Sequence, residues 1–259
     1  MMSDQFAQRM HKRERILGYW SVLDAPVVLE RLGRIGFDYV AIDGQHGLLG
    51  YSGILTGLMA IDAGAAAGGT RTVGLVRVQS KDPAVIGQAL DAGAHGVIVP
   101  LVNRPSDALE AVAAAKYPPL GIRSYGPMRS QLRIGPIPAE ADASVVVLAM
   151  IETREGLENV EKIAAVPGLS GLYIGPSDLA LALGARRPDD PDIAEDFAAA
   201  LDRIRAAADA NKLPVLIHTP DGESARRRLA EGFTGATIAS DLVHLEASAR
   251  NHLDIATHA

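Results

Sequence analysis

The sequence of 259 residues contains no cysteine. Disulfide bonds, thiolate zinc sites and cysteine nucleophiles are therefore excluded, and the composition fits a reducing compartment. An excess of positive charge is also missing, because the formal net charge is −6. A protein that binds nucleic acid irrespective of its sequence needs a basic face, so we expect no nucleic-acid partner.

Long apolar runs are missing as well. The first fifteen residues, MMSDQFAQRMHKRER, are polar and lack the apolar core of a secretory signal. The longest apolar run is far shorter than the roughly 20 residues that a transmembrane helix needs. We therefore expect a soluble, cytoplasmic protein without a membrane partner. No linker or low-complexity tract divides the chain, so residues 1–259 are predicted to form a single domain.

The chain does contain a regular alternation of short apolar runs and helical patterns. After an N-terminal helix that would close the bottom of a barrel, the predicted strands are 16–23, 37–42, 73–78, 96–99, 145–151, 172–174, 214–218 and 234–239. Eight strand–helix units predict an α/β protein with a (β/α)₈ TIM barrel. The alternative is an open doubly wound sheet, but no G-x-G-x-x-G fingerprint follows the first strand.

Two neighbouring strands of this plan lead into acidic residues. The run 145–151 is followed by Glu152, and the run 172–174 is followed by Gly-Pro-Ser and then Asp178. In a parallel barrel the C-terminal ends of the strands meet on one face. Each carboxylate could simply cap the helix that follows it. Together, on adjacent strands, the two oxygen ligands favour a site for Mg²⁺ or Mn²⁺.

A histidine and two further acids complete a candidate catalytic group. His46 lies in the loop after the second strand, and it is the natural general base because imidazole titrates near neutrality. Asp43 in the same loop and Asp91 on a later helix could orient it. His218 and Asp241 also follow strands, and we expect His218 to form part of the pocket wall rather than to act in catalysis.

Three more residues at this face are candidate substrate contacts. Arg77, near the end of the third strand, could stabilise a developing oxyanion or form a salt bridge to a neighbouring strand. Trp20, the only tryptophan, either packs in the core or lines the substrate site. Pro100 closes the fourth strand and is a second candidate for the wall of that site.

A divalent cation, an arginine and a histidine together suit deprotonation next to a carbonyl group. A 2-oxo acid can chelate the cation, while the cation and Arg77 stabilise the enolate oxygen and His46 moves the proton. No lysine lies at a strand end, so Schiff-base chemistry is not expected. The loops after the last two strands lack the paired glycines of a sugar-phosphate anchor, which disfavours a phosphosugar isomerase.

Six ordered motifs resemble those of the HpcH/HpaI aldolases, the metal-dependent class II pyruvate aldolases. They are FDYVAIDGQHG at 37–47, VRVQSKDP at 76–83, LDAGAHGVIVPLVN at 90–103, YPPLGIRS at 117–124, MIETREGLENV at 150–160 and GLYIGPSDLALALG at 171–184. The resemblance extends from about residue 16 to the end. It implies a (β/α)₈ barrel whose last helix is exchanged between subunits, usually in a homohexamer that is a trimer of dimers. It also implies that Asp91 supports the base histidine of a neighbouring subunit.

The resemblance assigns roles to the residues at the strand ends. It implies that Glu152 and Asp178 bind a divalent metal such as Mg²⁺, Mn²⁺ or Co²⁺. His46 would be the base, and Arg77 would stabilise the enolate. The amides of Ser177 and Asp178 would hold the carboxylate of pyruvate, as the first turn of a helix can.

Two positions depart from the family pattern, in which glutamate is common at Gln45 and glutamine at Met150. Met150 cannot donate the hydrogen bond of an amide, so the substrate range is affected rather than the metal or the base. The arginines of the long, proline-rich connection at 117–138, Arg123, Arg129 and Arg133, could bind a distal carboxylate or lie in solvent.

The sequence therefore predicts a lyase that cleaves a 4-hydroxy-2-oxo acid to pyruvate, or a close 2-oxo acid, and an aldehyde. Two alternatives remain open. One is a citryl- or malyl-thioester lyase of the same wider superfamily. The other is an oxo-acid-binding barrel without catalytic activity.

Overall fold

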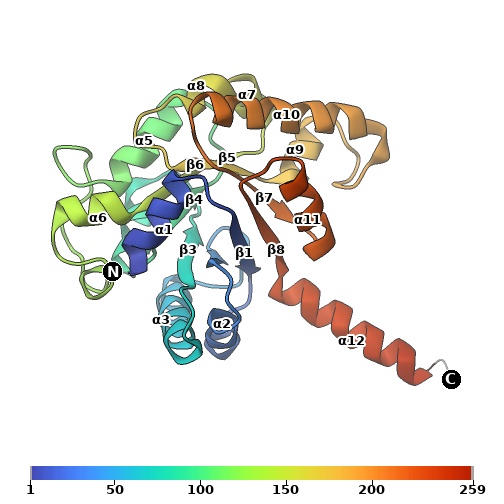
Figure 1. Cartoon of the computed structure of the whole chain (residues 1–259), viewed down its shortest axis with the longest axis horizontal. Helices are drawn as coiled ribbons and strands as arrows, with labels where there is room; N and C mark the ends of the chain where they lie inside the picture. Colours follow the sequence, from blue (N-terminus) through green and yellow to red (C-terminus); the bar gives the residue numbers. More distant parts are fainter. Residues whose placement is uncertain (1, 258–259) are drawn as a thin grey trace.

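The computed structural model describes residues 2–257, whose eight parallel strands close into a barrel (Figure 1). Each strand pairs with the next one along the chain, and β8 pairs with β1. The strands are β1 (Ile16–Ser21), β2 (Tyr39–Asp43), β3 (Val73–Arg77), β4 (Gly96–Val99), β5 (Val146–Ile151), β6 (Gly171–Ile174), β7 (Val215–Thr219) and β8 (Gly235–Ser240). The predicted (β/α)₈ barrel is confirmed.

Helices connect the strands around the outside of the barrel. They are α1 (Met2–His11), α2 (Pro26–Gly33), α3 (Tyr51–Gly68), α4 (Pro83–Asp91), α5 (Pro105–Ala115), α6 (Pro138–Ser144), α7 (Arg154–Glu158), α8 (Val160–Ala164), α9 (Pro176–Ala182), α10 (Ala194–Ala210), α11 (Gly222–Ala230) and α12 (Asp241–Thr257). Several begin with proline, which suits the first turn because the amide hydrogen that it lacks has no partner there. None of the helices within residues 2–257 is long and apolar enough to cross a membrane.

Side chains that alternate along each strand build two apolar layers. In β5, Leu148 and Met150 belong to the cluster inside the barrel, whereas Val147 and Ala149 pack against the helices. Leu148 is fully buried, and burial of such a side chain stabilises the fold by roughly 1.5–3 kcal/mol. Toward the C-terminal ends of the strands, the same alternation points functional side chains inward: Trp20, Asp43, Arg77, Met150 and His218.

Helix α1 closes the N-terminal end of the barrel, as the sequence predicts. Its side chains Phe6 and Met10 are buried in the interior cluster, where Phe6 contacts the ring of Tyr39 edge-on. Gly18 of β1 makes room for that tyrosine, because a Cβ atom at this position would lie 2.1 Å from the ring. The interior of the barrel is therefore closed by α1 at the N-terminal ends of the strands, and the catalytic pocket expected of this fold lies at their C-terminal ends.

Side-chain bonds to the backbone explain where the strand boundaries differ from the prediction. Strand β1 ends at Ser21 rather than residue 23, because the amides of Val22 and Leu23 donate to the carboxylate of Asp241, at 3.0 and 3.3 Å. The second strand begins at Tyr39 rather than residue 37 and extends to Asp43. These contacts are made between distant parts of the chain, so local pattern does not reveal them.

Helix α12 projects away from the barrel at the C-terminal end of the chain (Figure 1). It carries exposed apolar side chains along its length: Leu242, Val243, Leu245, Leu253 and Ile255. The exchange of this helix between subunits remains a prediction.

The long connection after α5 is held to the barrel by its arginines. Arg123 is almost fully buried and donates to Asp91 at 2.6 Å. Arg129 and Arg133 both pair with Asp62 of α3, the latter at 2.8 Å. These three guanidinium groups are thus bound by acids of the same chain, and they contribute nothing to the pocket described next.

Candidate active site

A pocket of about 200 Å³ opens at the C-terminal ends of the strands. It brings together most of the candidate residues from the sequence: Trp20, His46, Arg77, Glu152, Ser177 and Asp178. The remaining lining residues are Met150, Tyr173, Gly175, Pro176 and His218. The side chains come from six different strands and the loops that follow them, as in other barrels with a site at this face.

Asp43 organises one side of this pocket. It is the register partner of Arg77 on the neighbouring strand, and its carboxylate accepts bonds from Nε at 2.9 Å and from Nη2 at 2.5 Å. It also accepts from the amides of Gln45 and His46, at 3.0 and 3.1 Å, and from Nε1 of Trp20 at 3.2 Å. Burial alone would raise the pKa of Asp43, but the Arg77 bonds and charge and the two amides hold it below its ordinary value. The Asp43 carboxylate therefore fixes both Arg77 and the loop that carries His46.

Glu152 lies on the other side of the pocket, and only one of its two carboxylate oxygens accepts a hydrogen bond. Its Oε1 atom accepts from the amide of Leu101 at 2.8 Å, while Oε2 is buried and forms no hydrogen bond within the described residues. Burial raises the pKa of Glu152; the Leu101 amide opposes this shift and the charge of Asp178 adds to it. An unpaired buried carboxylate oxygen is costly unless a cation or another donor completes it.

Gly175 leaves space beside the carboxylate of Glu152. A Cβ atom at this position would lie 2.4 Å from Oε2 of Glu152, so any other side chain would occupy the space next to that oxygen. Asp178 follows in the first turn of α9. Within residues 2–257, no group of three or more histidine or acidic side chains is arranged to hold a metal by itself. Two carboxylates still fit Mg²⁺ or Mn²⁺, which keep several positions for water and substrate oxygens.

The two histidines of the pocket have different surroundings. His46 is exposed, and its backbone amide is fixed by Asp43. His218 packs edge-on against Trp20, with the ring centroids 5.4 Å apart. Burial and the positive charge of Arg77 lower the pKa of His218 to about 4, so this imidazole is neutral at pH 7. Both histidines line the pocket, and His46 is the more exposed of the two.

Three residues singled out in the sequence do not reach the pocket of this chain. Asp91 is the last residue of α4, toward the N-terminal end of the barrel, where it binds Arg123. Pro100 is buried behind β4 and is not among the lining residues. Asp241 accepts a bond from the hydroxyl of Ser21 at 2.6 Å and thereby joins the last helix to β1.

Comparison with known proteins identifies the family of this chain. The sequence model of the HpcH/HpaI aldolase/citrate lyase family matches residues 16–247. The chain belongs to this family. A hydroxypyruvate/pyruvate aldolase of Rhizorhabdus wittichii is 42% identical, over 90% of this chain and 91% of the relative. A 5-keto-4-deoxy-D-glucarate aldolase of Salmonella paratyphi A is 33% identical, over 97% of this chain and 96% of the relative.

Solved structures agree with the assignment to the HpcH/HpaI aldolases. A family member from Burkholderia cenocepacia superposes with a TM-score of 0.87 at 29% identity, covering 98% of this chain and 99% of the other. Together with the aldolase relatives, this similarity shows that the protein is an enzyme of the carbon–carbon lyase class.

Sequence reasoning missed three residues of this aldolase pocket. Tyr173 lies at its floor, where its hydroxyl donates to Thr237 at 2.6 Å; no chemical motif distinguishes this tyrosine from an ordinary core residue. Leu101 acts only through its backbone amide, which no side-chain pattern reveals. Gly175 was detectable in principle, since a glycine directly after a buried strand often marks a close approach.

Proposed function

We propose that this aldolase catalyses the reversible, metal-dependent cleavage of a 4-hydroxy-2-oxo acid to an aldehyde and pyruvate or a close 2-oxo acid. The observation that carries the proposal is the unpartnered, buried Oε2 atom of Glu152, in one pocket with Asp178, Arg77 and His46. The relative named hydroxypyruvate/pyruvate aldolase supports a small 2-oxo acid as the nucleophilic partner.

Glu152 and Asp178 would hold the divalent cation, which is Mg²⁺, Mn²⁺ or Co²⁺ in this proposal. Both side chains line the pocket, and oxygen donors are the ligands that such hard cations prefer. When bound, the cation supplies positive charge that polarises the keto group of the substrate. The amides of Ser177 and Asp178 would bind the substrate carboxylate at the first turn of α9.

Arg77 would stabilise the negative charge that develops on the keto oxygen. Asp43 fixes its guanidinium group through Nε and Nη2, which leaves Nη1 for the substrate. The group is prepositioned, so it does not need to reorganise when the charge forms. In the cleavage direction, the bond between C3 and C4 breaks, its electrons form the enolate, and the 4-hydroxyl proton leaves.

His46 would accept that proton and deliver a proton to C3 of the enolate, which gives pyruvate. The exposure of His46 and its place at the pocket mouth suit a group that exchanges protons with water. Trp20, Met150 and Tyr173 offer a mainly apolar floor. An aldehyde portion without a distal carboxylate fits this floor best, because Arg123, Arg129 and Arg133 lie elsewhere.

The proposal includes a shared site. In a homo-oligomer, which we propose to be a hexamer with exchanged α12 helices, Asp91 of one subunit would support His46 of its neighbour. Asp91 is partly exposed on its own subunit, so it remains accessible to such a partner.

Release of pyruvate from a panel of 4-hydroxy-2-oxo acids tests the function. We expect turnover of at least one adduct in the presence of Mn²⁺ and loss of turnover after chelation. Cleavage of citryl- or malyl-thioesters with no pyruvate release from any aldol adduct would assign the enzyme to the thioester lyases instead.

A further inference from the structure

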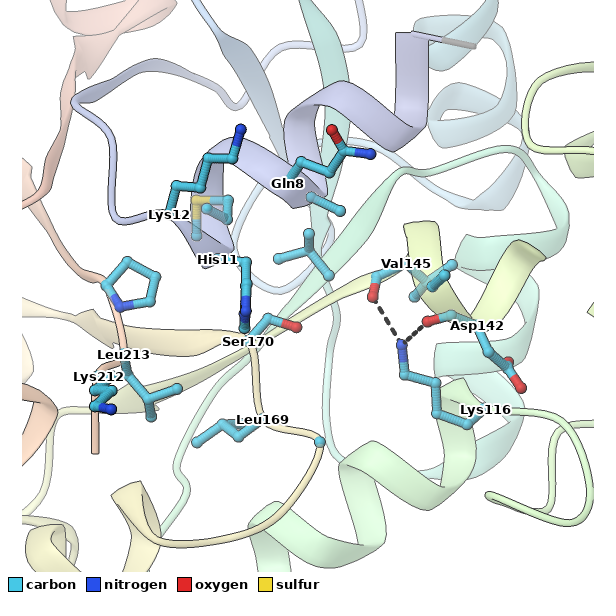
Figure 2. Close-up of a pocket in the computed structure, with 16 residues that line it drawn as sticks. Gln8, His11, Lys12, Lys116, Asp142, Val145, Leu169, Ser170, Lys212 and Leu213 are labelled. Atoms are coloured by element: carbon cyan, nitrogen blue, oxygen red, sulfur yellow. Dashed lines mark hydrogen bonds between the residues drawn. The ribbon is translucent and has the colours of Figure 1, made fainter. Parts of the chain in front are cut away.

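A second cavity, of about 620 Å³, is shown in Figure 2. Its lining residues precede the strands, so it lies at the opposite end of the barrel from the catalytic pocket. It is bounded by helix α1, by the C-terminal ends of α5 and α10, and by the segments that lead into β5, β6 and β7. Its apolar lining includes Met10, Leu169, Leu213 and Pro214, and among the described residues no phenylalanine, tyrosine or tryptophan lines it. The cavity is larger than the catalytic pocket, and the proposed chemistry does not use it.

Positive charge is concentrated around this cavity. The chain has five lysines, at positions 12, 81, 116, 162 and 212, and three of them, Lys12, Lys116 and Lys212, line it together with His11. Lys12 and Lys212 donate only from the backbone, to Gln8 and Asp209 respectively, and their ammonium groups have no hydrogen-bond or ion-pair partner among the described residues. The single acid of the lining, Asp142, is engaged by the amide of Tyr117 at 3.0 Å. Three lysines against one acid leave the cavity with an excess of positive charge.

Lys116 provides a fixed ammonium group at the wall. Its residue is only 9% exposed, and its Nζ atom donates to the backbone oxygens of Asp142 and of Val145, the latter at 2.9 Å (Figure 2). An ammonium group has three hydrogens, so one remains for a further acceptor. Burial lowers the pKa of Lys116, a cost that a bound anion would offset.

The backbone at Lys212, like that at Arg13 after α1, has a positive φ of 56°. Lys212 follows α10 with φ of 56°, whereas glycines with positive φ follow α4, α9 and α11: Gly93, Gly184 and Gly232. A left-handed conformation disfavours any residue that has a Cβ atom. Lys212 therefore lies at the cavity rim in a backbone conformation that glycine would adopt with less strain.

We infer that this lysine-lined cavity is a second ligand site, which binds a small aliphatic anion through phosphate or carboxylate oxygens. Separate ammonium groups act as point charges and suit such oxygens. Phenylalanine, tyrosine and tryptophan are absent from the described lining, and His11 is its one ring, so the three ammonium groups rather than base stacking indicate the kind of ligand. The site is independent of the proposed reaction, because no catalytic candidate lines it.

Isothermal titration of the intact protein with glycerol 3-phosphate and, separately, with tricarballylate tests this inference. We expect saturable binding of at least one probe, and the stronger of the two identifies phosphate or carboxylate as the recognised group. The paired change Lys12→Ala with Lys212→Ala should weaken binding by roughly tenfold or more, because two nearby charges are lost. Both residues are exposed, so the double variant should fold.

Matched changes separate a built site from general electrostatic attraction. Lys116→Met should weaken binding further; if it fails to fold, the double variant carries the test. Lys162→Ala removes an exposed lysine elsewhere and should leave the affinity unchanged. No binding of either probe at millimolar concentration, or equal binding by the wild type and the double variant, would overturn the inference.

Discussion

Asp43 and Arg77 face each other on neighbouring strands and form a two-point ion pair, at 2.9 and 2.5 Å, with almost no exposure to solvent. Among the described residues, neither side chain forms an ion pair with any other group. The pair joins β2 to β3 at the pocket and connects folding stability with the geometry of the site.

Replacement of Asp43 by alanine should destabilise the protein strongly. The change leaves the buried Arg77 without its partner, and breaking a buried ion pair in this way typically costs about 3–5 kcal/mol. Urea unfolding measures the effect. The matched control is Asp209→Ala, which removes the exposed ion pair to Arg13 and should cost no more than about 1 kcal/mol. Equal losses in the two variants would contradict the role of the buried pair.

Replacement of Glu152 by glutamine should separate stability from metal binding. Burial raises the pKa of Glu152, so the folded, metal-free protein disfavours its charge, and the neutral amide should stabilise that form. Added Mn²⁺ should then raise the melting temperature of the wild type but not of Glu152→Gln. Glu155→Gln, at an exposed ion pair, is the control. An unchanged response to Mn²⁺ in Glu152→Gln would remove this residue from the metal site.

His46 and Arg77 should fail in different ways when pyruvate alone is bound. His46→Ala should slow deuterium uptake into the pyruvate methyl group by roughly 10²–10⁴-fold, since it removes the proton carrier. Arg77→Lys keeps a positive charge beside Asp43 but loses the planar fork, and turnover should fall by on the order of 10²-fold with a smaller loss of pyruvate binding. Proton NMR follows the exchange, with metal content measured on each variant. Wild-type exchange by metal-loaded His46→Ala would place the base elsewhere, with His218 next in line.

Stability should fall as the pH is lowered from about 6.5 to about 4. His95 is buried, and burial lowers its pKa to about 4. The unfolded chain binds a proton on this imidazole below about pH 6.5, while the folded protein does so only near pH 4. The resulting loss reaches on the order of 3 kcal/mol at pH 4 and does not grow below it. His218 contributes in the same direction.

The histidine origin of this pH dependence can be checked by substitution. Denaturant midpoints measured at pH 7, 5.5 and 4.5 should vary less in His95→Asn than in the wild type. His252→Asn, on the exposed face of α12, should leave the variation unchanged. If His95→Asn and the wild type show the same slope, another group is responsible.

Asp91 should complement a defect at His46 if the site is shared between subunits. Asp91→Ala and His46→Ala homo-oligomers should each have low activity. Co-expressed as mixed oligomers, the two variants should recover part of it, because some interfaces then combine the intact His46 with the intact Asp91. Light scattering confirms the assembly. No recovery in verified mixed oligomers would rule out the cross-subunit role.

The sequence predicted the barrel and most of its pocket for one physical reason. Parallel strands buried on both faces leave continuous apolar runs, and the residue after each run lies at a known edge, as Glu152 does. Contacts between segments that are distant along the chain produce no comparable pattern in the sequence. The Asp241 bonds that end β1 early, the Leu101 amide and the lysine-lined cavity all depend on residues that only the folded chain brings together.

The donor that orients Glu152 has a consequence for how this enzyme tolerates mutation. Leu101 supplies only its main-chain N–H and holds φ of 53°, a conformation that glycine and asparagine adopt more easily than leucine. Its side chain is half exposed, so a different side chain here can leave the hydrogen bond to the Glu152 carboxylate intact. Of the common amino acids, only proline lacks the backbone N–H that donates to Glu152. An alanine scan would therefore miss the importance of this position, because alanine keeps the N–H that holds one ligand of the proposed metal in place.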